Sequence, residues 1–148
     1  MPLVVCLFFI SMLGILEALY VPARDARAII SKADVAATSA LAYRESVINY
    51  LIANPTFTGT VPDASLTYLW GYTRDPRWTN IVNATNLYVY ESSPSANTLL
   101  IDVLYSKTMK SYMVGKNVAG LIVSANGLAT GNPVPSGIPA GAILIAGK

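Results

Sequence analysis

The sequence predicts an α+β fold in which a long N-terminal helix precedes a small, antiparallel β-rich head. Three observations lead to this fold class. The first 21 residues form an apolar run with a single charge, the next segment is rich in alanine, and the part after Pro55 consists of short runs rich in Thr, Val, Tyr and Ile. Alanine favours helices, whereas β-branched and aromatic residues separated by Gly and Pro are typical of strands and turns.

The first predicted element is a transmembrane anchor at residues 1–21. Leu3–Leu16 reads LVVCLFFISMLGIL and carries no charge, and the run up to Val21 just reaches the length of about 20 residues that a helix needs to cross a bilayer. Glu17 lies near the far end of the run, where its side chain can extend to the membrane interface. An acid in a membrane helix is often functional, so Glu17 is also a candidate contact with a partner.

Two other interpretations of this run fit less well. A cleaved signal peptide would need a basic start and a small-x-small cleavage site, and the run offers neither. A helix buried in a protein core would not carry large apolar residues on all of its faces. The basic residues that follow the anchor bear on its orientation. By the positive-inside rule, Arg24, Arg27 and Lys32 favour a cytoplasmic location for the C-terminal part of the chain.

The second predicted element is an amphipathic, Ala-rich helix over residues 22–54. Its larger apolar residues fall mostly at intervals of three, four and seven residues, as on one face of a helix. Asn54-Pro55 ends it. Pro22 fits either a first helical turn or a kink, so the anchor and this segment could form one long helix kinked near Pro22.

Residues 55–148 are predicted to form the globular β-rich head. Tyr88 and Tyr90 alternate with Leu87 and Val89, which indicates a strand with one aromatic face. Asn126-Gly127 predicts a tight turn, Gly115–Asn117 a turn between strands, and Gly131–Pro139 an irregular loop. Met109–Val114 fits a helical turn or a strand equally. The candidate strands are Leu66–Trp70, Leu87–Tyr90, Leu99–Tyr105, Val118–Ser124 and Ala142–Ile145.

The composition argues against an enzyme, a metalloprotein and a nucleic-acid-binding protein. There is no histidine, which removes the commonest general base and metal ligand, and the only cysteine, Cys6, lies in the apolar run. The net charge of +2 arises from scattered residues, without a basic run to contact phosphates. The acids of the head, Asp63, Asp75, Glu91 and Asp102, have no spacing typical of a catalytic pair. We therefore expect no catalytic residues, no bound metal and no cofactor.

The most suggestive segment of the head is WGYTRDPRW, at residues 70–78. Two Trp and two Arg within nine residues match the composition of protein–protein hot spots. The alternative is a loop whose indoles cap the core while its arginines face water. The candidate partner-binding residues are Glu17, Trp70, Tyr72, Arg74, Arg77 and Trp78.

The chain as a whole resembles the PilM family of small inner-membrane proteins encoded with the thin, type IVb pili of conjugative plasmids. The resemblance rests on the length, the start PLVVCLFFISML, the segment GYTRDPRW and the ending NVAGLIVSANGLATGNPVPSGIPAGAILIAGK. It implies a single-pass protein of the bacterial inner membrane whose head faces the periplasm, against the weak positive-inside indication. It also implies a structural role in the basal body or in pilin transport, with pilus-assembly proteins, pilins and membrane lipid as partners and a homo-oligomer as a further option.

The predicted outline is also similar to that of a type IV pilin, which has an apolar half-helix, an amphipathic half-helix and a β-rich head. The chain departs from the pilin pattern because it has no basic leader, carries Val5 where a processed pilin would have its glutamate, and lacks a cysteine pair in the head. A pilin-like or minor pilin subunit, incorporated into the filament through its N-terminal helix, is therefore the alternative function.

Overall fold

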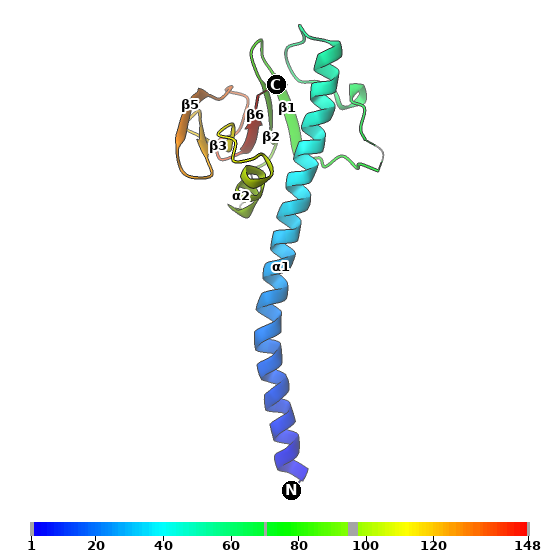
Figure 1. Cartoon of the computed structure of the whole chain (residues 1–148), viewed down its shortest axis with the longest axis vertical. Helices are drawn as coiled ribbons and strands as arrows, with labels where there is room; N and C mark the ends of the chain where they lie inside the picture. The colour runs from blue at the N-terminus through cyan, green and yellow to red at the C-terminus, as the bar shows by residue number, and fades with distance from the viewer. Residues whose placement is uncertain (1, 70, 95–97, 148) are drawn as a thin grey trace. The chain divides into compact units, whose positions relative to one another are not determined.

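The computed structural model describes residues 2–69, 71–94 and 98–147 and confirms the α+β fold (Figure 1). A long helix comes first, and most of the remaining elements belong to one sheet. The elements in chain order are α1 (Pro2–Ala53), the short 3₁₀ turn η1 (Asp63–Ser65), β1 (Trp78–Val82), β2 (Leu87–Glu91), α2 (Thr98–Lys107), β3 (Val114–Val118), β4 (Leu121–Ser124), β5 (Ala129–Pro133) and β6 (Ile143–Ala146).

Helix α1 contributes to two compact units, one ending at Lys32 and the other beginning at Ala33. Pro22 lies inside this helix, so the anchor and the Ala-rich segment form one helix. Large apolar side chains of the first unit are exposed, including Phe8 at 67% and Ile10 at 66%. By length and composition this helix could cross a membrane.

The sheet has six strands in the order β1-β2-β6-β3-β4-β5, and every adjacent pair is antiparallel. The last strand in the sequence, β6, lies at the centre. Its Ile145 is opposite Val89 of β2 on one side and Val114 of β3 on the other. All four residues of β6 are buried, which explains why this strand reads ILIA without a polar residue.

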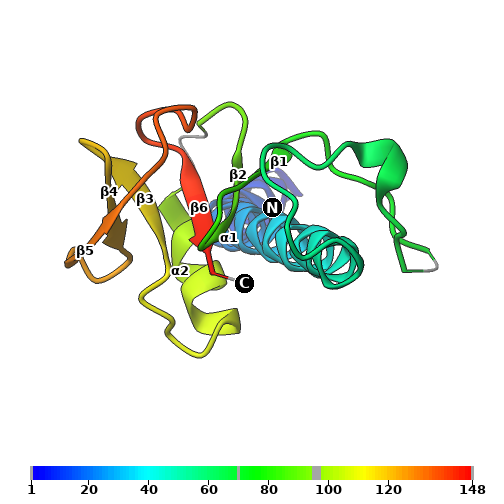
Figure 2. The ribbon, with the colours of Figure 1, turned by 90° about the horizontal axis from the view of Figure 1, so that it is seen from above.

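One face of the sheet packs against the second unit's part of α1 and against α2 (Figure 2). Ala36, Ala37, Ala40, Tyr43 and Val47 of α1 are buried at spacings of one, three and four residues. The three alanines allow the helix backbone to approach the sheet closely, and Tyr43 and Val47 fill the space farther along the helix. The buried face of this segment is therefore formed largely by alanines, whereas Val35 and Ile52, two of its larger apolar residues, are 66% and 74% exposed.

The other face of the sheet is covered by the chain between β5 and β6. Tyr88 and Tyr90 of β2 and Leu144 of β6 form a second cluster with Ile122 of β4 and Ile138 of the covering loop. Tyr88 Oη donates a hydrogen bond to the Pro133 carbonyl oxygen at 3.3 Å. The predicted aromatic face of this strand is therefore confirmed, and it is buried.

Two of the predicted strands are wrong. Residues 66–69 have no regular structure, and Trp70 lies outside the described residues. Residues 99–105 belong to helix α2, whose buried Leu100, Ile101 and Leu104 follow a helical spacing. The β-branched residues of LLIDVLY predicted a strand. This segment instead forms a helix because its apolar side chains pack against the sheet.

Three further predicted boundaries are wrong, because glycine or proline in a strand was interpreted as a turn or loop, or a glycine turn was overlooked. The predicted turn at Gly115–Asn117 is part of β3, where a Cβ on Gly115 would lie 2.3 Å from the Val123 carbonyl oxygen. The predicted strand 118–124 is interrupted by a tight turn at Ala119-Gly120, both with positive φ. The predicted loop from Gly131 begins inside edge strand β5, where a proline at the strand end is tolerated.

Candidate docking site

The structure distributes the predicted partner-binding residues over different environments. Glu17 is an exposed residue of the first compact unit, and Trp70 lies outside the described residues. Tyr72, Arg74 and Arg77 lie on the loop between η1 and β1. Trp78 begins β1, is 0% exposed and belongs to the core, so its indole is not available on the surface.

The loop that carries these residues is joined to α1 by a chain of polar side chains. Arg74 Nη2 lies 2.8 Å from Asp63 Oδ2, and Tyr43 Oη of α1 donates to Asp63 Oδ1 at 3.4 Å. Asn80 Nδ2 of β1 donates in turn to Tyr43 Oη at 2.7 Å. The guanidinium of Arg74 also lies 5.8 Å from the centroid of the Tyr43 ring. Four residues from α1, η1, the loop and β1 therefore hold one another in place.

Asn80 has a second role at the edge of the sheet. Its Oδ1 accepts a hydrogen bond from the Val61 N–H at 2.8 Å, and its Nδ2 donates to the Val61 carbonyl oxygen at 3.2 Å. Two backbone hydrogen bonds of 2.8 Å between Gly59 and Val82 continue this contact. The segment 59–61 consequently covers the outer edge of β1. Such a cover prevents an edge strand from pairing with a strand of another chain.

The electrostatics of this network keep its phenol neutral and its guanidinium charged. Burial raises the pKa of Tyr43, although the hydrogen bond from Asn80 opposes this effect. Burial alone would lower the pKa of Arg74, but the charge of Asp63 and the contact with Tyr43 raise it above its ordinary value. The network therefore combines the Asp63–Arg74 ion pair with one hydrogen bond from the Tyr43 phenol to the Asp63 carboxylate and one from the Asn80 amide to that phenol, and it joins the loop to α1.

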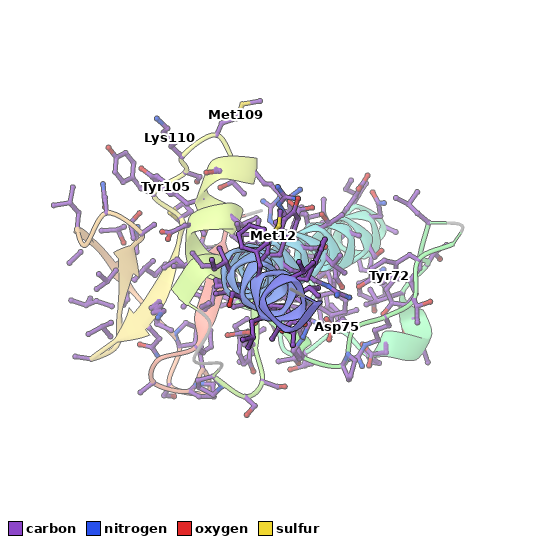
Figure 3. All side chains as sticks on the ribbon, turned by 90° about the horizontal axis from the view of Figure 1, so that it is seen from below. Met12, Tyr72, Asp75, Tyr105, Met109 and Lys110 are labelled. Atoms are coloured by element: carbon purple, nitrogen blue, oxygen red, sulfur yellow. The ribbon has the colours of Figure 1, made fainter. Side chains whose placement is uncertain are left out.

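A groove lies between the positioned loop and α1. Tyr72 Oη donates to the Ser39 carbonyl oxygen at 3.2 Å and lies 3.1 Å from Ser39 Oγ. Figure 3 shows Tyr72 and Asp75 on the loop beside α1. The groove has a volume of about 520 Å³, and Val35 on its helix wall is 66% exposed. We call this the α1–loop groove; its lining residues are Asp34, Val35, Thr38, Ser39, Ala42, Gly71, Tyr72, Thr73 and Asp75.

Arg77 is engaged within the loop itself. Its Nε lies 3.1 Å and 3.0 Å from the two carboxylate oxygens of Asp75, and its Nη2 lies 2.5 Å from Oδ2. The Arg77 N–H also donates to Asp75 Oδ1 at 3.0 Å. These hydrogen bonds lower the pKa of Asp75, so the carboxylate at the rim of the groove is charged near neutral pH.

Nothing in the part of the chain that the structure describes indicates a catalytic or metal-binding arrangement. Among them, no group of three or more His, Cys, Asp or Glu side chains is placed to hold a metal ion. Asp63 and Asp75 each pair with an arginine, and Glu91 is fully buried in β2. The α1–loop groove instead offers an exposed apolar side chain, hydroxyl groups and a charged rim, the mixture typical of a protein interface.

Residues that line the groove or hold its loop in place were missed in the sequence. Tyr43 and Ser39 look like ordinary helix residues, and Asn80 looks like part of a polar turn. They meet only because the chain returns to α1, since Tyr72 lies 33 positions after Ser39 and Asn80 lies 37 positions after Tyr43. Asp63 was considered only among the acids of the head, because its pairing with Arg74 has no local signal in the sequence.

Comparison with known proteins gives one family. A family model described as PilM matches residues 8–146. A crystal structure described as PilM from Escherichia coli B7A is similar with a TM-score of 0.57 at 15% identity, over 78% of this chain and 91% of that one. A crystal structure described as PilM from Pseudomonas aeruginosa 2192 is 29% identical, with a TM-score of 0.45, over 78% of this chain and 95% of that one. A search of curated proteins found no match.

Proposed function

The chain belongs to the PilM family of pilus-associated proteins, and from this membership we propose that it is a non-catalytic, membrane-anchored component of a bacterial type IVb pilus assembly apparatus. Its place would be the basal body or the pathway of pilin transport in conjugation. The first part of α1 would cross the inner membrane once, and the head would lie in the periplasm. The observation that carries the proposal is the pairing of an apolar helix long enough to span a bilayer with a head that presents a braced groove.

The role we propose is positional. The anchor fixes the head at the membrane, and the α1–loop groove receives another apparatus protein or a pilin. Val35 supplies apolar contact area and Tyr72 an aromatic wall, whereas the Asp63–Arg74–Tyr43 network keeps the loop ordered before binding. Preorganisation of this kind favours binding because less conformational entropy is lost when the partner arrives.

Co-purification from membranes tests this proposal. Full-length tagged protein should bring down pilus-assembly proteins or pilins, identified by mass spectrometry. Val35→Asp, which places a charge in the groove without touching the core, should reduce that recovery about tenfold or more, as expected for a central interface contact. Tyr112→Ser is the matched control, because Tyr112 is 57% exposed in a different part of the head. Recovery of no pilus protein would refute the apparatus role, and unchanged recovery with Val35→Asp would refute the groove.

The proposed orientation needs its own measurement. A reporter enzyme that is active only in the periplasm, fused after Lys148, should be active. An inactive reporter would place the head in the cytoplasm, as the basic residues after the anchor suggest, and the periplasmic docking role would then be wrong.

A pilin-like subunit is the second candidate, and the continuous α1 favours it. One 52-residue helix that is exposed and apolar near its start, with small residues packed into a β-rich head near its end, has the outline of a pilin. Purified filaments distinguish the two functions. Recovery of this protein along the shaft would support the pilin-like role, whereas its absence from filaments and presence in membranes would support the apparatus role.

A further inference from the structure

A second pocket on the head has a different chemical character from the α1–loop groove. It lies between α1, the end of α2 and β6, has a volume of about 360 Å³, and presents two cations, Arg44 and Lys107. Thr108 and Ser111 add hydroxyl groups, and Val114 and Ile145 form its apolar floor. Its lining, as far as the structure describes it, contains no acidic residue. We call it the Arg44 pocket.

The charge of Arg44 is only partly compensated. One nitrogen, Nη2, donates to the Gly147 carbonyl oxygen at 3.1 Å. Nε is shielded from solvent and has no hydrogen-bond partner among the described residues. Burial lowers the pKa of Arg44. A partly buried guanidinium that has no anionic partner within residues 2–69, 71–94 and 98–147 is unusual, because proteins generally pair such charges.

The turn after α2 forms the rim of the pocket. Met109 and Lys110 both have positive φ, at 54° and 62°, a backbone conformation that side-chain-bearing residues seldom adopt consecutively. The turn is held by a hydrogen bond of 2.8 Å from the Lys110 N–H to the Tyr105 carbonyl oxygen. Met109 is 94% exposed as a result, and Figure 3 shows Met109 and Lys110 projecting from the head. The flexible apolar side chain of Met109 is thus exposed to solvent beside the cationic Arg44 pocket. Exposed methionines of this kind are common at protein-binding surfaces.

We propose that the Arg44 pocket binds a carboxylate side chain of a protein partner, with Met109 packing on apolar atoms next to that carboxylate. The planar guanidinium matches a carboxylate in shape and charge. A phosphate group fits less well. Lys107 is already 2.9 Å from Asp34, and the pocket lies at the C-terminal end of α2, where the helix dipole disfavours dense negative charge. The inference extends the docking role proposed above to a second contact point, and it rests on that role for the identity of the partner.

A binding assay on the full-length protein in detergent micelles tests the inference without any pilus protein. The probe is an end-blocked hexaglutamate peptide, and hexaglutamine at equal ionic strength is the uncharged comparison. Hexaglutamate should bind at least about tenfold more tightly than hexaglutamine, and Arg44→Gln should remove most of that preference. Lys116→Gln is the charge-matched control, because Lys116 does not line the pocket.

A further variant guards against loss of folding. If Arg44→Gln unfolds the head, Lys107→Gln serves instead, since it removes only one side of a surface ion pair, and it should weaken hexaglutamate binding about threefold. Equal binding of the two peptides, or equal binding by wild type and the pocket variants, would overturn the inference. The inference would also be overturned if the protein bound phosphatidylglycerol vesicles in an Arg44-dependent manner but did not bind the peptide. That result would indicate that the pocket binds lipid. Because the assay contains no pilus protein, a negative result would not contradict the proposed role in the pilus apparatus. Failure of the co-purification experiment would likewise not contradict the proposed binding of a carboxylate in the Arg44 pocket.

Discussion

Asn80 Nδ2 donates a hydrogen bond to Tyr43 Oη at 2.7 Å, and this buried contact joins β1 to α1 across 37 residues of sequence. It is the inner link of the network that ends at Asp63 and Arg74 on the surface. The position of the loop that carries Tyr72 therefore depends on a phenol and an amide in the interior.

Removing the phenol oxygen tests this dependence. Tyr43→Phe leaves one Asn80 N–H without its acceptor while the ring remains in the core, so the free energy of unfolding should fall by about 1–2 kcal/mol. Urea unfolding followed by circular dichroism measures the change. Tyr112→Phe, at an exposed position, should have no measurable effect. Equal stability of wild type and Tyr43→Phe would show that the hydrogen bond contributes nothing.

The same phenol predicts a response to alkaline pH. Burial raises the pKa of Tyr43 above its ordinary value of 10.0, so the folded state binds this proton more tightly than the unfolded state does. Its contribution to stability is fully present below the unfolded pKa and is lost as pH rises through the folded pKa. The stability difference between wild type and Tyr43→Phe should thus be constant near neutral pH and should shrink above the unfolded pKa.

Urea titrations of both proteins at several pH values would show this shrinkage. Tyr90, whose pKa is also raised by burial, is present in both proteins and cancels in the difference. Burial raises the pKa of Tyr68 as well, and the charges of Asp63 and Tyr43 raise it further, so Tyr68 contributes to the difference in the same direction through its interaction with Tyr43. A difference that stays constant through strongly alkaline pH would contradict the assignment to Tyr43.

Gly115 should be intolerant of any side chain. An added Cβ would lie 2.3 Å from the Val123 carbonyl oxygen and 2.8 Å from Ile122 Cγ2, in the middle of the sheet. Gly115→Ala should therefore destabilise the head by about 1–3 kcal/mol, the usual cost of overpacking. The control is Gly127→Asn at the turn after β4, where φ is +80° and the space is open, because asparagine tolerates this conformation. Chemical denaturation measures both, and a larger loss in the control would refute the packing explanation.

The Asp75–Arg77 pair predicts a small effect at acidic pH. Hydrogen bonds from Arg77 lower the pKa of Asp75 below its ordinary value of 3.8. The resulting stabilisation is present above the unfolded pKa and disappears as pH falls through the folded pKa. Asp75→Asn should cost less than about 1 kcal/mol at neutral pH, because the Arg77 side chain is 45% exposed and water screens the ion pair. This cost should vanish in strong acid, and a cost that persists there would point to a role of Asp75 other than charge.

The candidate site shows where sequence reasoning reached its limit. The segment around Tyr72 and Arg74 was identified from its composition, because aromatic and arginine residues are enriched at interfaces. Its neighbours in the groove were not, since Val35 and Ser39 belong to a helix whose pattern describes only its own periodicity. Trp78 belongs to the same aromatic- and arginine-rich segment as Tyr72, but its side chain is buried in the core. Composition thus selected the segment, and burial separates the surface residues from the core residue.

The strands show the same division. Strands were predicted at Leu87–Tyr90 and Ala142–Ile145, within one residue of the observed β2 and β6, because buried central strands are continuously apolar or alternate clearly. Trp78–Val82 and Ala129–Pro133 at the sheet edges were not, because edge strands carry Asn, Gly and Pro, which are typical of loops. Residues 99–105 were misassigned because a short apolar run fits helix and strand equally, and only packing against the sheet decides.

The sequence by itself determined the α+β class, the apolar helix that could cross a membrane and the resemblance to the PilM family, because these depend on composition, local periodicity and extended similarity. The tertiary structure alone decided that β6 lies between β2 and β3, that Tyr43 and Asn80 brace the loop, and that Arg44 lies in a pocket with Lys107. Each of these joins residues far apart in the chain, and no local pattern records which distant segments will share a core.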